Sequence, residues 1–60
     1  MVKVNEIRKW KVETYSVING DTFIVTEMCN NFKVKIRYLK TGITKICEHN
    51  DIDTYTKVVK

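Results

Sequence analysis

Hydrophobic and polar residues alternate over much of the chain with a period of two, which is the pattern of half-buried β-strands. Residues that favour turns separate these stretches at Asn19-Gly20, Asn30-Asn31 and Lys40-Thr41-Gly42. The stretches between the turns are rich in Val, Ile, Thr, Tyr and Phe. They predict strands at Val12–Ile18, Thr22–Cys29, Phe32–Leu39 and Ile43–Cys47, with a short fifth strand at Thr54–Val59.

The remaining segments are less regular. Val2 and Val4 alternate like a strand, whereas Asn5–Trp10 fits one helical turn, so the first ten residues stay open between the two. Glu48–Asp53 is polar and predicts a loop or a single tight turn. A chain of 60 residues makes one domain with a thin core. We therefore expect residues 1–60 to form a mainly-β domain, a small five-stranded antiparallel barrel or strongly bent sheet with room for one short helical turn.

The turns also predict which side chains share a face of the sheet. If Asn30-Asn31 is a two-residue loop, Val25 lies opposite Ile36, with Phe23 opposite Tyr38 and Glu27 opposite Val34 in the same register. Residues that lie opposite each other point to the same side. Continued through the other turns, this register predicts a core made of Val12, Ile18, Phe23, Val25, Val34, Ile36, Tyr38 and Ile46.

The other face of the Phe32–Leu39 strand carries basic side chains. The same register places Lys45 directly opposite Arg37, and no acidic residue occurs from Met28 to Cys47. The net charge is +4 and the isoelectric point is near 9.2. Clustered cations predict contacts with phosphates or with an acidic protein surface, although lysines on a strand also deter edge aggregation. The basic residues in this segment are Lys33, Lys35, Arg37, Lys40 and Lys45.

Further motifs carry weaker signals. Trp10 stands among Arg8, Lys9 and Lys11, which suits base stacking or a partner contact, while the alternative is a tryptophan that caps the core. The segment Val17–Thr22 resembles the Gly-Asp-Thr strand of staphylococcal-type nucleases, but the arginine and acidic motifs of that site have no counterpart here.

No cofactor is predicted. His49 has no partner at catalytic spacing, and Cys29 and Cys47 fit no zinc motif, so we expect no metal. We expect two buried free thiols in a reducing cytosol, with a single disulfide as the alternative for a secreted chain.

Two segments, Gly20–Glu27 and Val34–Gly42, resemble small modules encoded by bacteriophages, which occur alone or in tandem beside homing-endonuclease or other DNA-binding domains. Glu27, Lys35, Tyr38, Thr41 and Gly42 match the recurring pattern in kind, and Asn50 and Ile52 stand for its last segment. The chain departs from the pattern at Ile43, where the modules have an aromatic residue, and it lacks their glycine-bearing Lys-Asp stretch. The resemblance implies a small open barrel of the Src-homology-3 type and a targeting module without a cutting domain.

Taken together, the sequence predicts a non-enzymatic module that binds the phosphate backbone of nucleic acid, DNA more than RNA. Lys33, Lys35, Arg37 and Lys45 would contact phosphates, Lys40 the rim, and Arg8 with Trp10 a secondary site. The alternative is a phage-encoded inhibitor that docks through the same face on a host or defence protein, such as a nucleic-acid-processing enzyme. A reduced nuclease ranks third.

The expected setting follows from the same features. Met1–Glu6 carries no apolar run, so we expect no secretory signal and a location in the cytoplasm, which is the host cytoplasm for a phage-encoded protein. We expect no membrane partner, because no stretch approaches the length needed to span a bilayer. A thin core with exposed strand edges is compatible with a homodimer.

Overall fold

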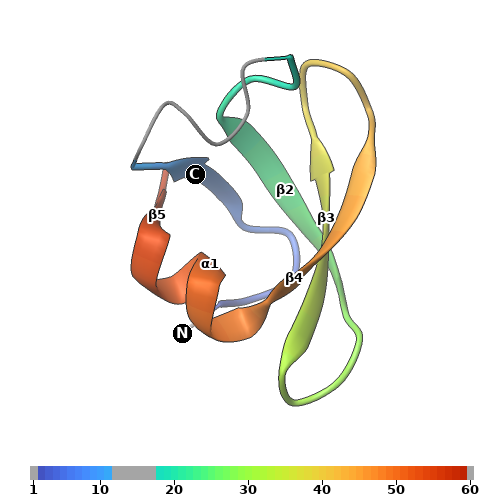
Figure 1. Cartoon of the computed structure of the whole chain (residues 1–60), viewed down its shortest axis with the longest axis vertical. Coiled ribbons are helices and arrows are strands. Elements are labelled where there is room, and N and C mark those ends of the chain that lie inside the picture. Colours follow the sequence, from blue (N-terminus) through green and yellow to red (C-terminus); the bar gives the residue numbers. More distant parts are fainter. Residues whose placement is uncertain (1, 12–17, 60) are drawn as a thin grey trace.

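A computed structural model of the chain describes residues 2–11 and 18–59. The described residues form five strands and one helix (Figure 1). In chain order these elements are β1 (Ile7–Trp10), β2 (Thr22–Met28), β3 (Lys33–Tyr38), β4 (Thr44–Glu48), α1 (His49–Tyr55) and β5 (Thr56–Val58).

The strands make one antiparallel sheet in the order β4-β3-β2-β1-β5. The sheet bends strongly, and α1 carries the chain across its hollow side from one edge strand to the other (Figure 1). Because β4 and β5 do not pair in the described sheet, the barrel stays open. The predicted mainly-β fold with a five-stranded, strongly bent sheet is confirmed.

Neither alternative for the first ten residues forms as predicted, because residues 2–6 are not a strand and the strand β1 lies at Ile7–Trp10, where a helical turn was considered. Asn5 adopts a positive φ of 74° and turns the chain just before β1. Its N–H donates to the Val25 carbonyl, and the Val25 N–H donates to the Glu6 carbonyl, which joins the turn to β2. The turn allows Val2 to be buried in the core, and β1 then fills the place beside β2.

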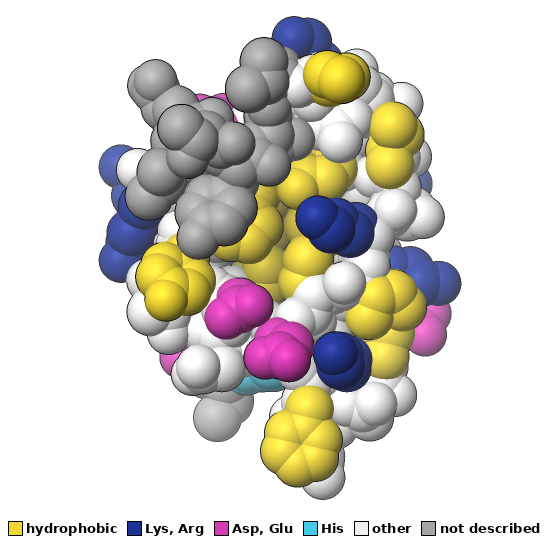
Figure 2. Space-filling model, viewed as in Figure 1, with side chains coloured by type: hydrophobic (Ala, Val, Ile, Leu, Met, Phe, Trp, Pro, Cys, Tyr) yellow, Lys and Arg dark blue, Asp and Glu magenta, His cyan; other side chains and the backbone are white. Residues whose placement is uncertain are grey.

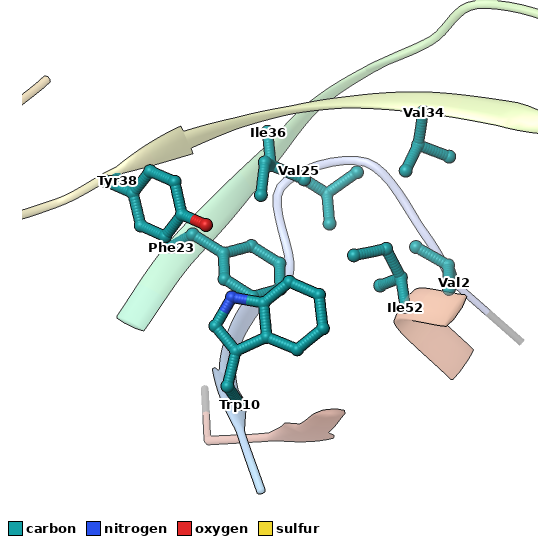
Figure 3. Packing of buried hydrophobic residues seen from close by; sticks show 8 residues of the cluster. All are labelled: Val2, Trp10, Phe23, Val25, Val34, Ile36, Tyr38 and Ile52. Carbon is teal, nitrogen blue, oxygen red and sulfur yellow. The ribbon is translucent and has the colours of Figure 1, made fainter. Parts of the chain in front are cut away.

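The core lies on the hollow side of the sheet, under α1 (Figure 3). Five of its predicted members are confirmed as buried: Phe23, Val25, Val34, Ile36 and Tyr38. Phe23 lies between two other aromatic rings, with ring centroids 5.5 Å from Trp10 and 6.1 Å from Tyr38. Val2, Trp10 and Ile52 complete the cluster and bring in the N-terminal segment, β1 and α1.

The turn between β3 and β4 is one residue longer than the sequence suggested. Gly42 takes the predicted positive φ, at 77°, but the Tyr38 N–H donates to Ile43, so Leu39 also belongs to the loop. A shift of one residue exchanges the two faces of a strand. Lys45 therefore lies opposite Ile36 and not Arg37, and Ile46, predicted in the core, is 53% exposed. Cys47 packs against the core instead.

The loop between β2 and β3 also differs from the predicted two-residue turn. The Asn30 side chain accepts hydrogen bonds from the N–H groups of Phe32 and Lys33, at 2.7 and 2.9 Å, and builds a longer loop. A bulge between Val25 and Glu27 absorbs the extra residue. The predicted pairs of Val25 and Phe23 are therefore correct, while Glu27 lies opposite Lys35 and not Val34.

Two predicted strands and the predicted core residues Val12 and Ile18 remain to be compared with the structure. The predicted strand at Val12–Ile18 lies outside the described residues except for Ile18, and so does the predicted core residue Val12. Ile18 is 78% exposed and does not belong to the core. The side of β2 that this strand would have paired with is occupied by β1. The predicted fifth strand forms, but only at Thr56–Val58.

The predicted loop at Glu48–Asp53 is wrong, because a helix begins at His49. Isolated helices of this length are unstable, and α1 is held by packing of its buried residue Ile52. No helix among residues 2–11 and 18–59 combines the length and apolarity needed to cross a membrane.

Arg8 is a buried cation that fastens the open side of the sheet. It is 5% exposed, and its Nε donates to Thr56 Oγ1 at 2.9 Å. One of its terminal nitrogens donates to Glu6 Oε1 at 2.9 Å, and the other lies 4.0 Å from Asp53 Oδ1. Thr56 in turn donates to the Ile52 carbonyl. One guanidinium thus joins β1 to the N-terminal turn, α1 and β5.

We expect Arg8→Met to destabilise the domain by about 2 kcal/mol, because it removes the hydrogen bonds of the buried guanidinium to Glu6 and Thr56. Urea unfolding followed by the fluorescence of Trp10, the single tryptophan, measures the change. Lys9→Met is the matched control, since Lys9 is exposed and should shift the free energy of unfolding by less than about 0.5 kcal/mol. Equal stabilities of the two variants would contradict a structural role for Arg8.

Glu6 makes the stability depend on pH. The Lys3 N–H, which donates to Glu6 Oε1 at 2.8 Å, and the Arg8 guanidinium hold the pKa of Glu6 below its ordinary value of 4.5. A lowered pKa in the folded state means that the ionised carboxylate stabilises the fold above pH 4.5 and that this contribution is lost as the pH falls through the folded value. The stability advantage over Glu6→Gln should therefore be largest near neutral pH and shrink in acid, as measured by urea unfolding at a series of pH values.

Candidate functional site

The side of the sheet turned away from the core is the surface on which the strands bring charges together. We call it the outer face. Its members follow from the register, because residues opposite each other in neighbouring strands point to the same side. They are Ile7 and Lys9 of β1, Thr22, Ile24 and Glu27 of β2, Lys33, Lys35 and Arg37 of β3, Thr44, Ile46 and Glu48 of β4, and Lys57 of β5.

Cations outnumber carboxylates on the outer face. Among the described residues its strands carry Lys9, Lys33, Lys35, Arg37 and Lys57, but only Glu27 and Glu48 with opposite charge. Lys9 and Lys57 lie directly opposite each other in the pairing of β1 with β5. Like charges in such positions destabilise a sheet, and the Asp21 carboxylate, 3.7 Å from Lys9 Nζ, offsets part of this repulsion. The sequence shows both lysines, but not that they lie opposite each other, since β1 was not predicted as a strand.

Arg37 occupies the part of this face where the neighbours are uncharged. It is exposed, and Ile24 and Thr44 lie on either side of it in the register. Within the described part of the chain, no carboxylate lies within ion-pair distance of Arg37. Its guanidinium is therefore available for a bidentate contact with a phosphate or carboxylate.

The other two cations of β3 have acidic neighbours. Lys33 Nζ lies 3.8 Å from Glu48 Oε1 across the pairing with β4. Lys35 is half-buried and lies opposite Glu27 on one side and Ile46 on the other. Exposed ion pairs contribute little and exchange readily, so an anion can compete for both lysines. No acidic residue occurs from Met28 to Cys47 in the sequence. In the observed register, however, Glu27 and Glu48, which lie just outside that segment, are paired opposite Lys35 and Lys33.

Lys40 and Lys45 do not lie on the outer face. Lys40 is exposed in the β3–β4 turn, beside Gly20, at the end of the sheet. Lys45 points to the hollow side, where it lines a pocket of about 330 Å³ with Trp10, Tyr38, Cys47 and Asp51. The predicted set of Lys33, Lys35, Arg37 and Lys45 on one face is therefore wrong for Lys45.

Arg8 and Trp10 are interior residues. Trp10 is 7% exposed and its ring packs on Phe23, while Arg8 is held in the ion-pair network described above. Burial leaves little of either side chain for a base to stack on. The prediction of a secondary contact at these residues is wrong, and the alternative of a tryptophan that belongs to the core is what forms.

Acidic groups gather on the opposite side of the molecule. In the view onto α1, acidic side chains lie over the helix, and Lys and Arg side chains appear both near the centre beside them and toward the margins (Figure 2). Asp51 and Asp53 belong to α1. The described residues contain no group of three or more His, Cys, Asp or Glu side chains placed to hold a metal ion. Asp21 is engaged by Lys9, with 3.7 Å between carboxylate and ammonium.

Both cysteines are free thiols in different surroundings. Cys29 is exposed, whereas Cys47 is partly buried against the core, and this burial raises the pKa of the Cys47 thiol. The thiolate is the reactive form, so Cys47 should react more slowly than Cys29 at neutral pH. Limited alkylation with iodoacetamide followed by peptide mass spectrometry should show Cys29 modified first. Modification of Cys47 ahead of Cys29 would contradict this burial.

Comparison of the chain with protein-family models, with curated proteins and with solved structures found no match. The geometry and charges of the outer face are therefore the features of the molecule that bear on its function.

Proposed function

We propose that the chain is a non-enzymatic nucleic-acid-binding module whose outer face contacts the phosphate backbone of DNA. The observation that carries this proposal is the excess of five cations over three carboxylates at that face, when Asp21 beside Lys9 is counted. Nucleic-acid phosphates are the commonest partners of such a surface, and each cation that replaces a counterion adds to affinity.

The arrangement suits backbone contacts more than base reading. A sheet face projects short rows of side chains, and the neighbours of Arg37 in its row, Ile24 and Thr44, leave its charge uncompensated. No described helix lies on this side to enter a groove, because α1 crosses the hollow side. Phosphate contacts hold a protein on the duplex without carrying sequence information, so we infer affinity with little sequence preference.

The proposed contact residues differ from those expected from the sequence. Arg37 is the centre, Lys35 lies beside it, and Lys9 with Lys57 extends the surface across the sheet. Lys33 contributes less, because a phosphate must first displace Glu48. Lys40 remains a rim contact at the end of the sheet, while Lys45, Arg8 and Trp10 are left out.

The resemblance to phage modules found beside DNA-binding domains supports the same class of partner, and a phage origin remains part of the proposal. The proposed place of action is the cytoplasm, which would be that of the host. The fold is compatible with this setting, because its described cysteines are free thiols, as expected in a reducing compartment.

The test is a titration of labelled duplex DNA at a series of salt concentrations. Lys35→Gln/Arg37→Gln should weaken binding and reduce the slope of log K against log salt by about 1.8, because two phosphate contacts are lost. Lys3→Gln/Lys45→Gln is the matched control, since it removes the same charge from exposed positions away from the outer face. We expect the control to retain the wild-type slope.

Two outcomes would contradict the proposal. Equal losses in both double variants would mean that net charge acts without a defined face. No binding to duplex or single-stranded nucleic acid at low salt would reject nucleic acid as the partner. An acidic host protein docked on the same face would then be the better explanation, provided that Lys35→Gln/Arg37→Gln abolishes its binding and the control does not.

A further inference from the structure

Strand β4 is an edge of the sheet, and its free hydrogen-bonding groups can be assigned residue by residue. The Tyr38 N–H donates to the Ile43 carbonyl, and the His49 N–H donates to the Phe32 carbonyl. These two hydrogen bonds mark the ends of the ladder between β3 and β4. Residues alternate in antiparallel pairing, so Ile43, Lys45, Cys47 and His49 direct their backbone groups toward β3. The N–H and C=O groups of Thr44, Ile46 and Glu48 therefore point to the open edge, where the described sheet has no further strand.

The free backbone groups of β4 are arranged symmetrically about its middle residue, Ile46. We propose that the chain forms a symmetric dimer in which β4 pairs antiparallel with β4 of a second copy, with Ile46 facing its counterpart across the two-fold axis. Thr44 then lies opposite the second copy's Glu48, and the reverse. All three residues with free backbone groups fall in hydrogen-bonded pairs. Each such pair exchanges two bonds, so the three pairs supply about six.

Other registers of the same strand are less favourable. Centring the pairing on Lys45 would place two lysines opposite each other at the axis. Centring it on Cys47 would pair Ile46 with Glu48 but put Thr44 opposite Asn50 of α1, so only part of the strand could be used. Centring it on Glu48 would place two carboxylates opposite each other and run the pairing into α1. Centring it on Thr44 would extend the pairing into the β3–β4 turn. Only the register centred on Ile46 uses the whole strand and opposes no like charges.

The side chains also favour a second copy as the occupant. Ile46 is 53% exposed on the outer face, and pairing with its counterpart would cover apolar surface on both copies. Each Glu48 would lie opposite a threonine. Natural edge strands are commonly protected by proline, bulges or charged side chains, lysine above all. The chain has no proline and the pairing of β4 with β3 shows no bulge, which leaves Lys45 and Glu48 as the charged side chains of this edge strand. An isologous contact of this kind closes as a dimer.

Sedimentation equilibrium of the protein alone, from about 1 µM to about 1 mM, tests the proposal over the range of weak to moderate affinities. We expect the wild-type chain to shift from the monomer mass to twice that mass. Ile46→Asp places two carboxylates face to face at the axis and should remain monomeric over the same range. Ile43→Asp is the matched control, because Ile43 is similarly exposed but lies before β4, and it should still dimerise.

A cross-linking experiment tests the register itself. In a Cys29→Ser/Cys47→Ser background, Ile46→Cys should form an intermolecular disulfide on mild oxidation, because facing residues in a hydrogen-bonded pair are about 5.5 Å apart at Cα. Ile43→Cys in the same background should form little. A wild-type chain that stays monomeric throughout the range would overturn the proposal, as would an Ile46→Asp variant that dimerises like wild type or equal cross-linking at both positions. Circular dichroism of each variant checks that it is folded.

Discussion

The four-residue turn between β3 and β4 determines which side chains the protein offers to its surroundings. Its last residue, Gly42, adopts a positive φ of 77°, a conformation that costs other residues free energy. Because side chains alternate along a strand, the length of this turn decides the face on which every residue of β4 lies. It sends Ile46 to the outer face and Cys47 toward the core, and it turns Lys45 away from Arg37. The proposed interface and the proposed dimer both depend on this register.

A second constraint is the small size of the core. Among residues 2–11 and 18–59, eight buried hydrophobic side chains hold an open sheet together, and two of them, Val2 and Ile52, come from outside the strands. The buried Arg8 adds hydrogen bonds and ion pairs to this small apolar core, because its planar guanidinium reaches Glu6, Asp53 and Thr56 at once. A charge removed from water is tolerated only with such complete pairing. The arginine thus closes the side of the structure where the two edge strands do not meet.

The sequence predicted the parts of this fold that local patterns determine. The alternation in β2 and β3 and the residues of their turns identified the central hairpin and five core residues, among them Phe23 and Ile36. Loop lengths were harder to predict, because Asn30 and Gly42 each support more than one turn. The helix was missed since its seven residues are polar apart from Ile52 and Tyr55, and only tertiary packing of Ile52 makes it stable.

The candidate site was predicted in part for the same reason. Lys33, Lys35 and Arg37 share one strand, so period-two alternation was enough to place them together. Lys57 joins them through the pairing of β1 with β5, a contact between residues far apart in the chain. Local spacing carries no information about such a contact. Arg8 and Trp10 were predicted as a secondary contact because a tryptophan between cations is a frequent arrangement for base stacking, whereas here β1 turns both side chains inward.

The two proposals reinforce each other physically, although each can fail alone. Joining two copies through β4 would place their outer faces side by side in one continuous sheet. The two β3 strands would then be three strand spacings apart, about 14 Å, so the cationic rows of both copies would face the same way. The salt dependence of binding grows with the number of phosphates neutralised, and a dimer would double that number without any new cation. The unpaired edge of β4 would then be what makes a surface of modest charge sufficient for binding, because the second copy supplies the other half of the contacts.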